Sequence, residues 1–126
     1  MNPESLSEWL TSYAQAWSVR DSLRIASLFS DDAIFQETPF ADPLHGRPAI
    51  RTFWENAITD QSEVDLGFEV LSVTPNMGIA QWWASYTLIS TADVVKVDGI
   101  AVIGLSTHNV CTSFHQWWHS VVIPAE

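Results

Sequence analysis

SDDAIFQETPFADPLHGRPAIRTFW, residues Ser30–Trp54, is the segment from which the layout of the chain can be worked out. It joins a helix end, a short apolar strand, a proline-rich loop and a new helix that begins at Pro48. Within it, Glu37 stands between Phe35 and Phe40. A carboxylate with large apolar neighbours loses hydration, which raises its pKa and makes it a candidate proton carrier. Glu37 is therefore our first candidate for a functional residue.

Two helices are expected before this segment. Apolar residues at three- and four-residue spacing predict the first helix from Pro3 to about Val19. Ser5 and Glu8 match a capping box at its start. The second helix is predicted over Asp21–Phe29, with an aspartate N-cap and with Leu23 facing inward. The chain thus opens with two amphipathic helices.

After the segment, the third helix is expected to run to about Ile58, and then the apolar period changes from helical to alternating. Alternation predicts four strands joined by short turns: Val64–Val73, Gly78–Ser90, Val94–Ser106 and Val110–Val121. Helices followed by a run of antiparallel strands are typical of an α+β fold with the helices on one sheet face. At 126 residues we expect one domain that spans residues 1–126.

The composition excludes several classes of partner. Fifteen acidic and five basic residues give a net charge of −10, with no basic patch for nucleic acid or an anionic membrane. We find no apolar stretch of membrane-spanning length and no signal-peptide pattern at the start. The lone Cys111 cannot form an internal disulfide. We expect a cytoplasmic protein.

The histidines do not predict a metal site. His115 and His119 are four residues apart in a predicted strand, which separates them by about 13 Å, too far for one ion. No other group of histidine, aspartate and glutamate has the spacing of metal ligands. We therefore expect neither a metal nor another cofactor.

Several motifs together resemble the nuclear-transport-factor-2-like superfamily, which includes ketosteroid isomerase, limonene epoxide hydrolase and SnoaL-type polyketide cyclases. They are Arg20–Asp21, Leu28–Ala33 (LFSDDA), Gly46–Ile50 (GRPAI), Phe53–Trp54 and Trp117–Trp118. The resemblance covers essentially the whole chain. It implies a cone-shaped, cystatin-like α+β domain, with three N-terminal helices packed on a curved antiparallel sheet. It also implies a homodimer.

The same resemblance assigns roles to single positions. Glu37 stands where ketosteroid isomerase has its general base, and Tyr13 where it has its oxyanion-hole tyrosine. Ala101 replaces that enzyme's second oxyanion donor, and Gln116 replaces an acid of limonene epoxide hydrolase. The resemblance thus implies isomerase- or cyclase-like proton transfer on an apolar carbonyl compound, with Glu37 and Tyr13 as the catalytic pair. The sequence departs from ketosteroid isomerase at Ala101 and from limonene epoxide hydrolase at Gln116.

An aromatic pocket for an apolar small molecule is the companion expectation. The residues expected to line it are Trp17, Phe35, Phe40, Trp54, Trp82, Tyr86, Ala101, Gln116 and Trp118. Three alternatives stay open at this point. The aromatic side chains fill the cone and leave no cavity, Glu37 is a rim carboxylate that is solvated or paired with Arg47 or Arg51, or Tyr13 is an ordinary core residue. In function, the alternative is a non-catalytic binding or dimerisation module.

Overall fold

The computed structural model describes residues 1–126 and has three helices and six strands. The helices are α1 (Pro3–Ser18), α2 (Ser22–Ala26) and α3 (Arg47–Ala57), and a 3₁₀ turn, η1 (Ile58–Asp60), follows α3. The strands are β1 (Phe29–Gln36), β2 (Leu44–His45), β3 (Gln61–Val73), β4 (Gly78–Leu88), β5 (Val94–Leu105) and β6 (Cys111–Ile123). The predicted order of elements is confirmed. No helix has the length and apolar character needed to cross a membrane.

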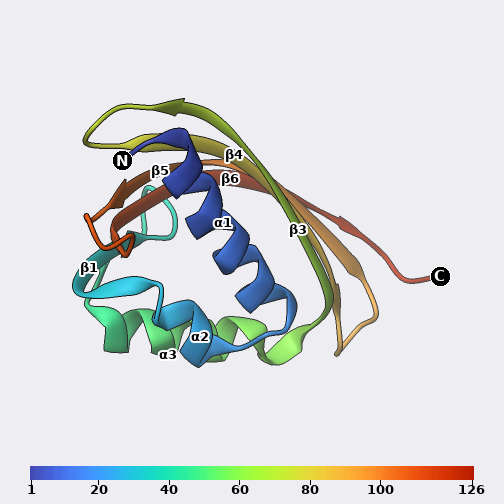
Figure 1. Ribbon diagram of the computed structural model, residues 1–126. Helices are drawn as coiled ribbons and strands as arrows, with labels where there is room; N and C mark the ends of the chain where they lie inside the picture. Colours follow the sequence, from blue (N-terminus) through green and yellow to red (C-terminus); the bar gives the residue numbers. More distant parts are fainter.

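The six strands form one sheet in the order β2-β1-β6-β5-β4-β3. The sheet curves over α1 without closing into a barrel, and α2 and α3 lie beside one another at one end of the cone (Figure 1). This confirms the α+β fold with helices on one sheet face. One detail is wrong: β1 pairs with β6 in parallel, so the sheet is mixed rather than wholly antiparallel.

The start of α1 differs from the predicted capping box. Asn2 is the N-cap, and it exchanges hydrogen bonds with Ser5 rather than Ser5 with Glu8. The reason is Pro3, which lacks a backbone N–H and therefore favours the first helical position. Trp9, Tyr13 and Trp17 recur on the buried face of α1, as the periodicity predicts.

Helix α2 is shorter than predicted. Asp21 is its N-cap, as expected, and accepts a hydrogen bond from the backbone N–H of Arg24 at 3.0 Å. The helix ends at Ala26, where the hydroxyl of Ser27 donates to the Arg24 carbonyl, a local bond that competes with helix continuation. Phe29 consequently begins β1. Leu23 does not face inward, since it is 59% exposed.

The helix side of the sheet carries the core. Phe35 on β1 stacks on Phe114 of β6, with ring centroids 5.1 Å apart, across the parallel pairing. Because side chains alternate along a strand, the burial of Phe114 places Gln116 and Trp118 on the same, helix-facing side of β6. The sequence left this choice open. The other side of β6 is exposed at Trp117.

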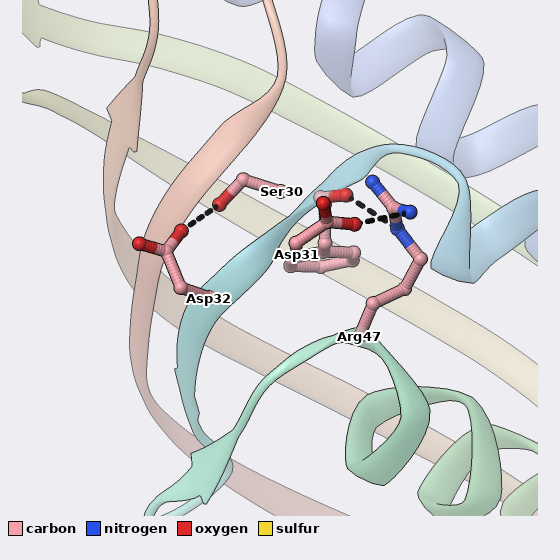
Figure 2. A network of polar contacts seen from close by, with 5 residues as sticks. Ser30, Asp31, Asp32 and Arg47 are labelled. Carbon is pink, nitrogen blue, oxygen red and sulfur yellow. Dashed lines mark hydrogen bonds and ion pairs between the residues drawn. The ribbon is translucent and has the colours of Figure 1, made fainter.

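Arg47 connects the beginning of α3 to β1. Its guanidinium pairs with Asp31 at 2.7 Å and donates from Nε to the Phe29 carbonyl at 3.0 Å. Figure 2 shows this contact beside the hydrogen bond that the Ser30 hydroxyl donates to Asp32. The Asp31 side chain is largely exposed and that of Arg47 is partly exposed, so the ion pair contributes little to stability. It connects the beginning of α3 to the beginning of β1.

Candidate functional site

A cavity of about 270 Å³ opens between α1, α3 and the helix-facing side of β4, β5 and β6. Its lining is mostly apolar and aromatic, with one carboxylate and two amides. The lining residues are Trp17, Glu37, Phe53, Trp54, Ala57, Gln61, Trp82, Tyr86, Val97, Gln116, Trp118 and Ser120.

The sheet side of this cavity is a row across three strands. Trp82 of β4 lies opposite Gly99 of β5, which lies opposite Trp118 of β6. Residues directly opposite one another point to the same face of a sheet, so the two tryptophans flank a position that has no side chain. The glycine allows Trp118 of the neighbouring strand to approach β5 closely, because an added Cβ would lie 2.8 Å from the Trp118 Cβ.

Glu37 follows the last residue of β1 and is partly buried at the cavity. The indole N–H of Trp118 donates to its backbone carbonyl at 3.0 Å. Partial burial raises the pKa of the Glu37 carboxyl above its ordinary value, and the Trp118 indole beside it lowers that pKa in part. An ion pair at the rim is the wrong alternative, because Arg47 pairs with Asp31 and Arg51 with Glu55. The carboxylate therefore has no cationic partner.

Two amides add polarity to the aromatic walls. Gln61, at the start of β3, accepts a hydrogen bond at Oε1 from the Trp17 indole at 2.7 Å, which leaves its NH₂ group free. Gln116 is only 8% exposed, and its side chain makes no hydrogen bond within the protein. Gln116 is predicted at the site from the sequence, whereas Gln61 is not. The only indication of Gln61 in the sequence is that a polar residue stands just before an alternating pattern.

The cavity wall also holds unpaired indole donors. The Nε1 atoms of Trp54 and Trp82 are buried and have no hydrogen-bond partner. A buried N–H without a partner costs about 1–3 kcal/mol, so such groups are uncommon without a functional reason. Trp54 comes from α3 and Trp82 from β4, and both line the cavity. Because both Nε1 atoms are covered by protein, they lie behind the surface of the cavity and do not reach an occupant.

Tyr13 lies deeper than predicted. It is buried in the core, where its ring stacks on Trp9 with centroids 5.1 Å apart, and it is not among the residues that line the cavity. Burial, with smaller contributions from Cys111 and Glu37, raises the pKa of the Tyr13 hydroxyl well above its ordinary value. Tyr86 does line the cavity, and burial followed by the charge of Glu37 raises its pKa as well.

The structure brings most of the predicted ligand-binding residues together. Those that line the cavity are Trp17, Trp54, Trp82, Tyr86, Gln116 and Trp118. Phe35 and Ala101 are buried in the core instead. Phe40 is fully exposed in the loop after β1, so the structure does not place it at the cavity. Its neighbours Pro39 and Asp42 carry the loop outward into solvent.

The matched family is the SnoaL-like domain, whose model covers residues 10–109 of the sequence. The chain belongs to this family. No curated protein matches the sequence of this chain. The match to the family covers most of the chain and includes most of the helical region and the first strands that surround the cavity.

Solved structures with the same fold span nearly the whole chain. SalBIII, an epoxide hydrolase/cyclase-like enzyme in pyran ring formation of salinomycin, has a TM-score of 0.80 at 20% identity, over 94% of this chain and 95% of its own. A putative isomerase from Bacillus subtilis has a TM-score of 0.81 at 19% identity, over 94% of this chain and 90% of its own.

A third structure is a hypothetical protein from Catenulispora acidiphila with a ketosteroid isomerase-like fold, solved in complex with trimethylamine. Its TM-score is 0.76 at 14% identity, over 93% of this chain and 86% of its own. At these identities, the three neighbours establish the fold.

Proposed function

We propose that this SnoaL-like domain binds an apolar carbonyl compound in the cavity and moves a proton on it, as an isomerase or cyclase does. The observation that carries the proposal is Glu37, a partly buried carboxylate without a cationic partner at an aromatic cavity. A carboxylate with a raised pKa is a stronger base once it is ionised, which suits abstraction of a proton next to a carbonyl. Two structures with the same fold, the cyclase-like enzyme SalBIII and the putative isomerase from Bacillus subtilis, support this class of reaction.

The proposal also needs a donor for the negative charge that develops on the carbonyl oxygen. Tyr13 is the donor implied by the family resemblance, but it lies in the core behind the cavity lining. Gln116 and Tyr86 offer further donors from the cavity wall itself. Both tyrosines stay protonated at neutral pH because burial raises the pKa of each hydroxyl, so each remains able to donate.

Replacing Glu37 by glutamine tests the base. We expect the Glu37→Gln variant to lose about 10²–10⁴-fold in turnover of a steroid or polyketide-like enone, because the amide cannot accept the proton. Wild-type turnover should fall as the pH drops through the raised pKa of Glu37, since the carboxylate is then protonated. Glu69→Gln, at an exposed position of β3, is the matched control. Equal turnover by the wild type and both variants would contradict the catalytic role.

A non-catalytic binding module is the alternative within the same fold. The Catenulispora neighbour solved with trimethylamine supports a small-ligand role for such a domain. In that case Glu37 anchors the ligand without removing a proton. Binding of the enone to wild type without turnover, measured by quenching of tryptophan fluorescence, would favour this alternative over the enzyme.

We also propose that the chain forms a homodimer through the outer sheet face, in a cytoplasmic setting. Trp83 of β4 and Trp117 of β6 are 42% and 48% exposed there, beside an open groove. Large exposed aromatic side chains on a bare sheet face are typical of an interface. Wild type should therefore sediment as a dimer at micromolar concentration, and a Trp83→Ser/Trp117→Ser variant as a monomer. A monomeric wild type would contradict the proposal.

A further inference from the structure

We infer that the cavity beside Glu37 binds an organic cation, an amine or quaternary ammonium compound whose charge is surrounded by alkyl groups. The inference rests on the proposal that this cavity is the ligand site, and it goes beyond it by naming the chemistry of the occupant. Glu37 then serves as the counter-ion of the bound ligand.

The aromatic walls have the tryptophan- and tyrosine-rich composition of cation-binding sites. Trp17 contacts Trp54, Trp82 and Tyr86, with ring centroids 5.0, 6.1 and 6.5 Å apart. The planes of these rings cross the plane of Trp17 at 64°, 59° and 49°, so the rings pack edge-on or tilted instead of in a parallel stack. Trp118 lines the same cavity without ring contact to that group. Faces of tryptophan and tyrosine attract ammonium groups, tryptophan most strongly.

The charges around the cavity also favour a positively charged ligand. Glu37 is the only acidic residue that lines it, and no lysine, arginine or histidine does. Arg47 and Arg51 are held by Asp31 and Glu55. A partly desolvated carboxylate without a partner gains most from a cation that arrives with the ligand. The net charge of −10 also draws cations toward the domain.

The size and polar groups of the cavity narrow the ligand further. A volume of about 270 Å³ lies near the lower end of the range of small-molecule pockets, which suits a small ligand or a small head group. The Gln116 amide and the free NH₂ of Gln61 can bond an oxygen on the same ligand. A small ammonium compound that also carries a hydroxyl or carbonyl oxygen matches all of these groups.

Choline and 3,3-dimethylbutan-1-ol form the decisive pair of probes. The alcohol has the shape of choline, with a carbon in place of the charged nitrogen, so a difference in affinity reports the charge alone. By titration calorimetry we expect choline to bind wild type at least about tenfold more tightly than the alcohol. The preference should shrink in Glu37→Gln, which keeps the side-chain shape and the aromatic walls, and persist unchanged in the exposed control Glu69→Gln.

Thermal unfolding of each variant shows that it is folded before its binding is compared. Equal affinity for the two probes, or no binding of choline by wild type, would overturn the inference. Turnover of a neutral enone tests the proposed reaction separately. If the wild type turns over the enone but does not prefer choline over the alcohol, the inference of a cationic ligand fails and the proposed reaction stands. If it prefers choline but Glu37→Gln turns over the enone as fast as the wild type, the proposed proton transfer fails and the cationic ligand stands.

Discussion

Replacing Trp9 by alanine is expected to lower the free energy of unfolding by about 4 kcal/mol. Trp9 is buried at the middle of α1, where it stacks on Tyr13 and meets Phe29 edge-on, with ring centroids 5.1 and 5.6 Å away. Its indole N–H also donates to the Leu28 carbonyl at 2.9 Å. Truncation therefore removes packing on several sides and one of the two hydrogen bonds that the Leu28 carbonyl accepts, the other coming from the backbone N–H of Cys111 at 2.8 Å.

Urea unfolding followed by circular dichroism measures this loss. Trp83→Ala is the matched control, because Trp83 is the same residue type on the exposed side of β4. Its truncation should cost about 1 kcal/mol or less in the isolated subunit. If the two substitutions cost the same, the buried aromatic cluster around α1 would not be the main source of stability.

The strands after Asp60 could be predicted because each has one buried and one exposed side. That arrangement places an alternating pattern in the sequence, and Trp82 and Ala84 alternate with Trp83 and Ser85 accordingly. The parallel pairing of β1 with β6 could not be predicted. It joins Phe35 to Phe114, which are far apart in the sequence, and no local pattern specifies a distant partner.

The candidate site was predicted in part for a similar reason. Trp82 and Trp118 could be placed in the cavity because strand alternation decides the direction of a side chain. Phe40 lies in an irregular loop, where the apolar character of a residue does not indicate its direction. The depth of Tyr13 and the lack of an ion pair at Glu37 depend on how helices and sheet pack together, which sequence periodicity does not describe.

Alanine at Gly99 is expected to disturb both stability and the site. An added Cβ would lie 2.5 Å from the Trp117 carbonyl oxygen and 2.8 Å from the Trp118 Cβ. Backbone atoms of the neighbouring strand cannot swing aside, so β5 and β6 would have to separate. We expect a loss of about 3 kcal/mol in the free energy of unfolding.

Gly67→Ala is the matched control for this prediction. Its added Cβ would meet the indole of Trp83, an exposed side chain that can rotate into solvent, so the cost should be about 1 kcal/mol or less. Gly99→Ala should also weaken choline binding, because moving β6 displaces Trp118 from Glu37. Urea unfolding and calorimetry check the two effects. Equal stability of the two alanine variants would show that the sheet accommodates a side chain between Trp82 and Trp118.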